Sequence, residues 1–334
     1  MIIKAVIGFL TGDSSEEDHY TLKLEGRLNI EPGSDDFLSK FEPILAQNCT
    51  YKQITIDLTD VSFIYPAVIF FLLGIKTQLE NKKIGFNVVV NDKSELAYYL
   101  QHCGLGNVFP EINEIEIDKS QQLNKRDVME IKWLSTLADT QGTAIQIVDW
   151  FISKQMMSIN VEANVIDSIE EILRNIKQHS GFSNYGYVGQ AFPKSNRIRL
   201  AFYDNGVGIK KHLTKKPYKE THKRFQELIS PTVFKGIKTL PSNFAIEKAS
   251  IYEVSGTNYN DNSGAGIDFI LRTLSPSTNG IVSIISGDGY VSWKKGEMCK
   301  SYALPFKLAG TLVAICIDVV PNSILKYKAE NGPF

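Results

Sequence analysis

Apolar and polar positions along the first third of the chain switch between the alternation typical of strands and the spacing typical of helices. Residues 1–10 and 20–30 carry strand patterns, the second with leucine at alternate positions. The segments that follow are predicted as a turn and amphipathic helix over 31–48, a strand over 51–64, an apolar helix over 66–83, a strand over 84–91 and a helix over 92–109. We expect this last helix to begin with Asp92 as its N-cap and to end at Gly104. The alternation predicts an α/β layer.

A polar and charged stretch over 111–128 marks the predicted boundary between two domains, residues 1–118 and 119–334. Two helical patterns then run nearly back to back from 143 to 178, and the second has an isoleucine- and valine-rich face. Its apolar positions are Val165, Ile169, Ile172 and Ile176. Strands are predicted over 197–204, 280–286, 289–294 and 310–320, with the sequence Ser-Gly-Asp-Gly at 286–289 as a hairpin turn.

Composition narrows the range of partners and compartments. The chain has 334 residues, which exceeds the usual size of a single core and allows two domains. A net charge of -1 gives no overall attraction to nucleic acid or anionic lipid, so such a partner would need a local patch. The longest apolar run, Phe63–Ile75, is too short for a bilayer, and the four cysteines form no CxxC pair. We therefore expect a cytoplasmic protein without membrane attachment.

Three polar motifs carry candidate chemistry. In the second helix of the 143–178 region, Glu171, Asn175 and His179 are spaced at i, i+4 and i+8 and point to roughly one side. An Asn oxygen is a suitable ligand for Mg²⁺, and a Glu can orient or deprotonate a water. Asp204, at the end of the strand over 197–204, can accept a hydrogen bond from an exocyclic amine.

The other motif residues are glycines. Gly206 and Gly208 follow Asp204 and allow the backbone to approach a flat base or a phosphate. Gly264 and Gly266 lie in Ser-Gly-Ala-Gly, a turn that opens a helical pattern, where backbone N–H groups favour phosphate. Each motif alone is common in proteins, but their order and their placement on strand and helix ends together predict one nucleotide site.

These motifs resemble those of the GHKL ATPases, the superfamily of gyrase, Hsp90-type chaperones, histidine kinases and MutL. ExxxNxxxH is similar to its N box, DNGVG and SGAGIDFI to its two glycine boxes, and the strand beginning Gly310-Thr311 to its last strand. The resemblance covers about residues 140–320 and implies an α/β sandwich, a mixed sheet backed by helices. It also implies ATP and Mg²⁺ as cofactors.

The resemblance further implies a role for each residue. Glu171 is the general base or the residue that polarises the nucleophile, Asn175 holds Mg²⁺, and Asp204 binds the adenine amino group with Thr311 behind it. Gly206 and Gly208 shape the base pocket, Gly264 and Gly266 contact the phosphates, and His179 lines the site. Residues 210–238, with nine Lys or Arg and two Glu, correspond to the mobile ATP lid. This segment is interpreted either as a solvated lid or as a docking patch for an acidic partner or, less expected, nucleic acid.

The N-terminal part, about residues 18–110, resembles a STAS domain, the fold of anti-sigma-factor antagonists. In phosphorylated members, this strand is followed by Asp-Ser-Ser-Gly, and the second Ser is the phosphoacceptor. Here Tyr65-Pro66-Ala67-Val68 follows the strand, and Ala67, at the position of that Ser, has no hydroxyl. The domain is therefore interpreted as a binding or regulatory module.

Three functions stay open at this point. The first is a regulatory ATPase in which lid closure over ATP controls the STAS-like domain, a protein partner or a second subunit of a homodimer. The second is a protein serine/threonine kinase of the anti-sigma type that acts on a separate STAS-like partner. The third is an ATP-binding module without turnover. A sensor histidine kinase is disfavoured because His102 is the only histidine between Tyr20 and Gln178.

Overall fold

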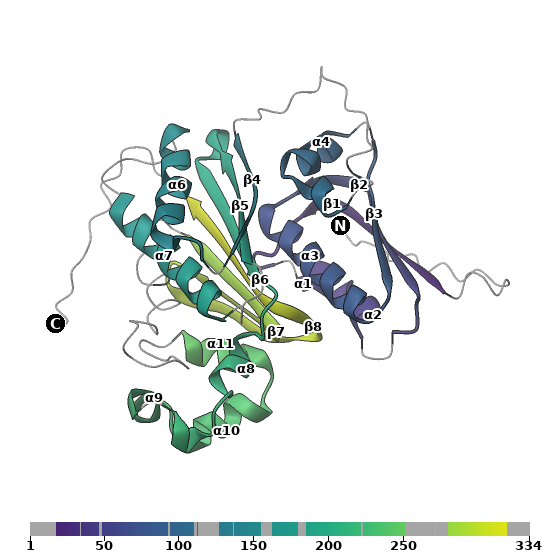
Figure 1. The fold of residues 1–334 in the computed structure, drawn as a ribbon. Coiled ribbons are helices and arrows are strands. Elements are labelled where there is room, and N and C mark those ends of the chain that lie inside the picture. Colours follow the sequence, from purple (N-terminus) through teal and green to yellow (C-terminus); the bar gives the residue numbers. More distant parts are fainter. Residues whose placement is uncertain are drawn as a thin grey trace.

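The computed structural model describes residues 18–33, 35–46, 49–92, 94–109, 112, 127–135, 137–154, 162–179, 185–221, 223–250, 271 and 280–318. The α/β class is confirmed, since helices pack against one parallel and one antiparallel sheet (Figure 1). The strand pattern predicted over 1–10 lies outside the described residues.

The N-terminal sheet is parallel and has the order β1-β2-β3, formed by β1 (His19–Leu28), β2 (Gln53–Ile64) and β3 (Gly85–Val89). Parallel neighbours need long crossovers, and the predicted helices supply them. These are α1 (Asp35–Ser39) and α2 (Glu42–Leu45) between the first two strands, and α3 (Pro66–Asn81) between the second and third.

The last N-terminal helix, α4 (Glu95–His102), begins later than predicted. Its N-cap is Ser94, whose hydroxyl accepts the Ala97 N–H, so the assignment of Asp92 as N-cap was wrong. Ser94 has the extended backbone that an N-cap requires and stands directly before the first helical residue. Gly104 lies just past the helix in the left-handed region with φ 79°, which explains why the helix ends there, before η1 (Leu105–Asn107).

The C-terminal sheet has the order β4-β5-β6-β8-β7, and every pair is antiparallel. Its strands are β4 (Val128–Leu134), β5 (Tyr185–Phe192), β6 (Arg197–Asp204), β7 (Ile281–Lys294) and β8 (Glu297–Asp318). The expectation of a mixed sheet was therefore wrong for the described strands. Short turns, η5 (Pro193–Ser195) and the pair Lys295–Gly296, join β5 to β6 and β7 to β8, and such turns connect only antiparallel strands.

The hairpin turn predicted at 286–289 was also wrong. β7 continues through these residues, and the register with β8 shifts between Ser286 and Gly289 as in a bulge. The strands reverse at Lys295 and Gly296, with φ values of 55° and 83°. Two consecutive positive φ values are the signature of the tight turn that matches the twist of a hairpin.

Helices α6 (Thr140–Ser153) and α7 (Glu162–His179) form the two predicted back-to-back helices and cover one face of the antiparallel sheet (Figure 1). Asp139 caps α6 by accepting the Gln141 N–H. The predicted apolar face of α7 is confirmed, because Val165, Ile169, Ile172 and Ile176 are all buried in the core between α7 and the sheet.

Helix α3 lies between the two sheets and packs on β6 and β8 as well as on β3 (Figure 1). It is apolar around most of its circumference, as expected for a helix buried on both sides. At Gly74 a Cβ atom would stand 2.8 Å from Leu308 Cδ1, so the helix approaches β8 closely, and the Phe70 ring stacks on Tyr203 with centroids 5.8 Å apart. One hydrophobic core is thus shared by both parts of the chain.

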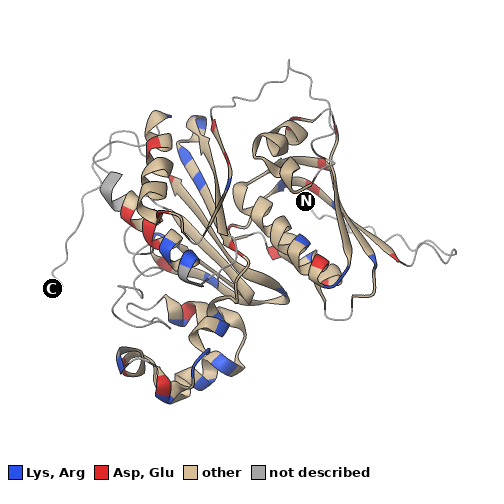
Figure 2. Cartoon of the chain, viewed as in Figure 1, with Lys and Arg blue, Asp and Glu red and all other residues tan. Residues whose placement is uncertain are grey.

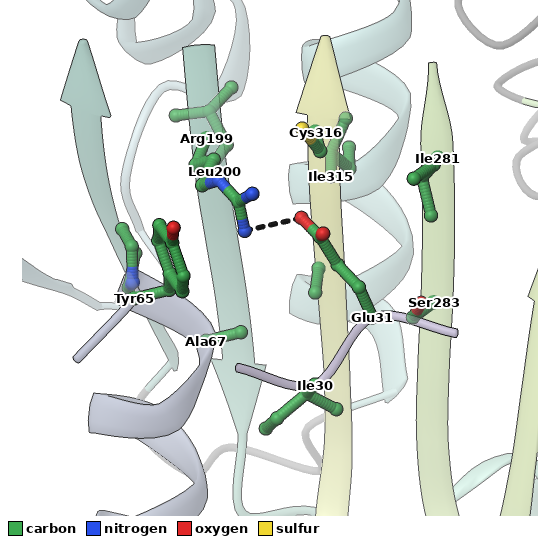
Figure 3. A pocket seen from close by; sticks show the side chains of 12 residues that line it. Ile30, Glu31, Tyr65, Ala67, Arg199, Leu200, Ile281, Ser283, Ile315 and Cys316 are labelled. Atoms are coloured by element: carbon green, nitrogen blue, oxygen red, sulfur yellow. Dashed lines mark ion pairs between the residues drawn. The ribbon is translucent and has the colours of Figure 1, made fainter. Parts of the chain in front are cut away.

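An ion pair at the rim of this shared core also joins the two parts. Arg199 of β6 pairs with Glu31, and the guanidinium carbon lies 3.6 Å from the ring centroid of Tyr65 (Figure 3). Only 9% of the Arg199 side chain is exposed, so losing either partner would leave a buried charge. The predicted boundary between 118 and 119 lies outside the described residues, and the two-domain division stays a prediction.

In the described part of the segment between β6 and β7, residues 209–221 and 223–250 contain five short helices and are called the helical subdomain here. The helices are α8 (Ile209–Leu213), η6 (Tyr218–Glu220), α9 (Lys223–Leu228), α10 (Pro231–Thr239) and α11 (Ser242–Ala249). The subdomain has its own small core, which includes Phe225 and Phe234. These aromatic rings therefore hold the helices together. Lysines are spread along the same helices (Figure 2), and most of them are exposed.

Candidate nucleotide site

Strand register places three of the polar side chains of this site next to one another. Asp204 at the end of β6 is the partner of Thr311 in β8, and Thr311 is the partner of Ser286 in β7. All three are buried. Their neighbours two residues away in each strand, Phe202, Val313 and Ile284, belong to the core under α6 and α7. Because side chains alternate between faces, the trio lies on the face of the sheet that α6 and α7 cover.

Asp204 supplies the carboxylate of this trio, and only 1% of its surface is exposed. It accepts the Gly206 N–H at 2.7 Å and a hydrogen bond from the Thr311 hydroxyl. Burial raises the pKa of Asp204 to about 7, against the opposing effect of these two donors. The carboxyl group is thus held at the strand end by its own turn and by the neighbouring strand.

Ser286 extends this network to the start of the helical subdomain. Its hydroxyl lies 3.2 Å from the Thr311 hydroxyl and accepts the Ile209 N–H, the first amide of α8, at 2.9 Å. Gly208 has φ 77°, and a Cβ atom there would stand 3.0 Å from the Ser286 oxygen. Glycine at 208 therefore serves both the backbone conformation and the close packing on Ser286.

Gly310 is a second position that admits only glycine. It has φ 77°, and a Cβ atom there would stand 1.7 Å from the carbonyl oxygen of Asp204. That distance is far inside van der Waals contact, so any side chain would push β8 away from the end of β6. The glycine before Thr311 thereby sets the position of both hydrogen-bonding partners.

Helix α7 holds the second candidate group. Asn175 donates its amide Nδ2 to Glu171 Oε1 at 3.3 Å, and Arg174 pairs with Glu171 Oε2 at 3.2 Å. Burial raises the pKa of Glu171, while the Arg174 charge and the Asn175 hydrogen bond act in the opposite direction. With its NH₂ turned to Glu171, the Asn175 amide leaves its oxygen as the group for a cation.

The structure brings some of the predicted residues together, while others lie outside the described residues. Glu171 and Asn175 contact each other, and α7 packs on the same sheet face as the Asp204 trio. Among the described residues, the hydrogen bonds of Glu171 and Asn175 stay on α7, whereas those of Asp204, Thr311 and Ser286 join the strand ends to one another and to the start of α8. Gly264 and Gly266 lie outside the described residues, as does the side chain of His179, whose backbone ends α7.

Among the described residues there is no cluster of three or more His, Cys, Asp or Glu side chains that could hold a metal. A magnesium ion at Asn175 would take its other ligands from phosphate oxygens and water, as Mg²⁺ commonly does in nucleotide sites. The residues present are compatible with that arrangement, since Asn175 offers a neutral hard oxygen and Glu171 a nearby carboxylate.

The pocket drawn in Figure 3 is a different feature. It is lined by Arg199, Ser283 and Cys316, among others, and includes Glu31 and Tyr65 from the N-terminal part. Arg199 and Cys316 alternate with Leu200 and Ile315 of the α7-facing core, so they point to the α3 side of the sheet. None of the predicted site residues lines it.

Sequence reasoning missed Ser286 and Gly310. Ser286 was taken as the first residue of a turn, and its role becomes visible only when β7 is paired with β8. Gly310 was quoted as the start of a strand, without its close approach to Asp204. A glycine followed by threonine at the start of a predicted strand is a weak signal for such a contact.

Comparison of the chain with protein-family models, curated proteins and solved structures finds no match. In the described part of the chain, no helix combines the length and apolar character needed to cross a bilayer.

Proposed function

We propose that this protein binds Mg-ATP on the α7-covered face of its antiparallel sheet and acts as a regulatory ATPase. The observation that carries the proposal is the buried carboxyl of Asp204, fixed at the strand end by Gly206 and Thr311. A buried carboxylate needs hydrogen-bond donors, and the amino group of adenine is one. The motif resemblance to GHKL ATPases supports the same assignment.

Asp204 also predicts which base is bound. Adenine carries an amino donor at C6, whereas guanine carries a carbonyl acceptor at that position. A carboxylate facing the carbonyl would leave both groups without a donor, and a site built to receive an amine strongly rejects the analogue that lacks it. The proposal therefore specifies adenine nucleotides.

Glu171 and Asn175 supply the proposed phosphate end of the site. The raised pKa of Glu171 suits a group that takes a proton from the attacking water. The Asn175 oxygen would hold Mg²⁺, and Gly264 and Gly266 would contact phosphates. The helical subdomain, whose first amide is bound to Ser286, would move against the nucleotide and report its presence to the N-terminal part or to a protein partner.

Labelled ATP tests the catalytic part of this proposal. Wild-type protein with Mg-ATP is expected to release free phosphate and to leave no label on the protein. Glu171→Ala should keep ATP binding and lose about 10²- to 10⁴-fold in phosphate release. The isosteric Glu171→Gln is the matched control for the carboxylate itself, because it keeps the side-chain volume.

Three other outcomes are informative. Label transferred to a protein hydroxyl, in this chain or in an added STAS-like partner, would contradict hydrolysis and favour the kinase. Binding without either product would favour an ATP-binding module. Phosphate release that is unchanged in Glu171→Ala would remove Glu171 from the reaction.

A further inference from the structure

The distal part of the β7–β8 ribbon contacts two elements that are far apart in sequence. Side chains of β8 alternate between the faces of the ribbon, and Lys300, Ser301 and Tyr302 are consecutive. The outer two residues contact α1 of the N-terminal part, and the middle residue contacts α11 of the helical subdomain. Three adjacent residues therefore connect both parts.

On the α1 side, Asp35 is the point of contact. Its carboxylate pairs with Lys300 and accepts the Tyr302 hydroxyl at 2.9 Å. The Lys300 ammonium lowers the pKa of Asp35, so the carboxylate is ionised at neutral pH. Tyr290 of β7 adds a hydrogen bond to the Ile30 carbonyl, at 3.2 Å, a few residues before α1.

On the opposite side, Ser301 contacts α11. Its hydroxyl accepts the Asn243 amide at 2.9 Å and donates to the Glu247 carboxylate. Asn243 and Glu247 are one turn apart on α11, so both face the ribbon. The helix also lies close to the bulge of β7, because a Cβ atom on Gly289 would stand 2.2 Å from the Asn243 nitrogen.

The same bulge leads to the candidate nucleotide site. Asp288 accepts the Ser242 N–H, the first amide of α11, at 2.8 Å. Two residues earlier, Ser286 contacts Thr311 and the first amide of α8. The bulge thus fixes the start of α8 and the start of α11, one at each end of the helical subdomain.

We infer that the Lys300–Ser301–Tyr302 segment of β8 couples the N-terminal part to the helical subdomain, so that the Asp35 contact regulates access of nucleotide to the site. The predicted effect on nucleotide binding rests on the proposed function. The mechanical arm of the inference, which is the coupling between α1 and α11, does not depend on nucleotide. When α1 moves so that Asp35 no longer contacts Lys300 and Tyr302, residues 300–302 keep only their contact with α11. The pleat of β8 then shifts, and Ser301 holds α11 less firmly.

Coupling of this kind is reciprocal. If closing of the helical subdomain over nucleotide strengthens the grip of Ser301 on α11, then nucleotide also strengthens the contact of α1 with the ribbon. The inference therefore predicts that an event at α1, such as binding of a protein partner, changes nucleotide affinity, and that nucleotide changes the affinity for that partner.

Amide hydrogen exchange of the full-length protein tests the mechanical arm without any nucleotide. Asp35→Asn and, as a milder variant, Tyr302→Phe should speed exchange in α11 by roughly three- to tenfold, the effect of losing one or two partly exposed polar contacts. The matched control is Asp60→Asn, since Asp60 also pairs with a lysine, Lys23, at 2.7 Å but lies on β2, away from the ribbon. Exchange in β5 reports any general loss of stability.

Faster exchange in α11 but not in β5, in both variants and not in the control, would support the coupling. Unchanged exchange in α11, or equal acceleration in α11 and β5, would overturn it. In a second arm, Mg-ATP affinity is measured by calorimetry for the same variants, where a threefold or larger change is expected. Wild-type protein that binds no ATP would contradict the proposed function, whereas the exchange result would still decide the coupling.

Discussion

The sharpest structural prediction concerns Gly310. Alanine would be unfavourable there for two separate reasons. The backbone has a positive φ of 77°, and the added Cβ atom would stand 1.7 Å from the Asp204 carbonyl oxygen. The left-handed conformation alone costs an L-residue about 1–2 kcal/mol. The clash adds to this, because the atom in the way is backbone at the end of a buried strand and has no rotamer by which to move.

Gly26 provides a matched control for the conformational part. It has φ 75°, and a Cβ atom there would meet nothing within 4 Å. We expect Gly26→Ala to lower the free energy of unfolding by about 1–2 kcal/mol. Gly310→Ala should exceed that loss by at least about 2 kcal/mol, within the range for forcing extra atoms into packed structure.

Urea unfolding of both variants, followed by circular dichroism, measures the difference. Gly310→Ala should also weaken Mg-ATP binding, because relief of the clash separates Thr311 from Asp204, whereas Gly26→Ala should leave binding unchanged. Equal losses of stability in the two variants would refute the claim that β8 is locked against the end of β6 at this residue.

Three further predictions follow from the same contacts. Phe70→Ala should lower the free energy of unfolding by about 3–5 kcal/mol and destabilise both sheets together, which amide hydrogen exchange in β2 and β6 measures. Replacing the exposed Val89 by alanine should change the free energy of unfolding by no more than about 0.5 kcal/mol. The pKa of Asp204 is raised on folding to about 7, so the folded state binds its proton more tightly than the unfolded state. Stability without nucleotide should therefore fall as pH rises from about 4 to about 7, by at most about 1.4 kcal/mol per pH unit, and urea titrations of Asp204→Asn should lack this component. Asn175→Ala should bind ATP equally well with and without magnesium, whereas the wild-type protein should bind more tightly with it, and a magnesium titration distinguishes the two.

Local sequence signals predicted most helices and strands but not how they pair. The apolar run of α3 marked it as a core element, and its lack of a polar face follows from its position between two sheets. That position depends on β6 and β8, more than a hundred residues away in the sequence. The two sheets share a core because Gly74 lets α3 approach Leu308, a contact that no local pattern encodes.

The error at residues 286–289 has a clear physical cause. Gly287 and Gly289 are typical turn residues, but here they form a bulge beneath α11, where Ser242 and Asn243 need space. Turn chemistry at Lys295–Gly296 carries a weaker sequence signal, yet long-range pairing of β7 with β8 selects it. The contact between Asp204 and Thr311 was expected because the motifs name both residues. Ser286 was missed because only cross-strand register brings it next to Thr311.

Isothermal titration of the full-length protein with ATP and with GTP, each in the presence of magnesium, shows whether Asp204 selects an adenine nucleotide. We expect ATP to bind and GTP to bind at least tenfold more weakly. Asp204→Asn should lose about 10- to 150-fold in ATP affinity, the range for a hydrogen bond to a charged group. Equal affinities for ATP and GTP, or an Asp204→Asn variant that binds ATP as tightly as the wild type, would contradict that role of Asp204.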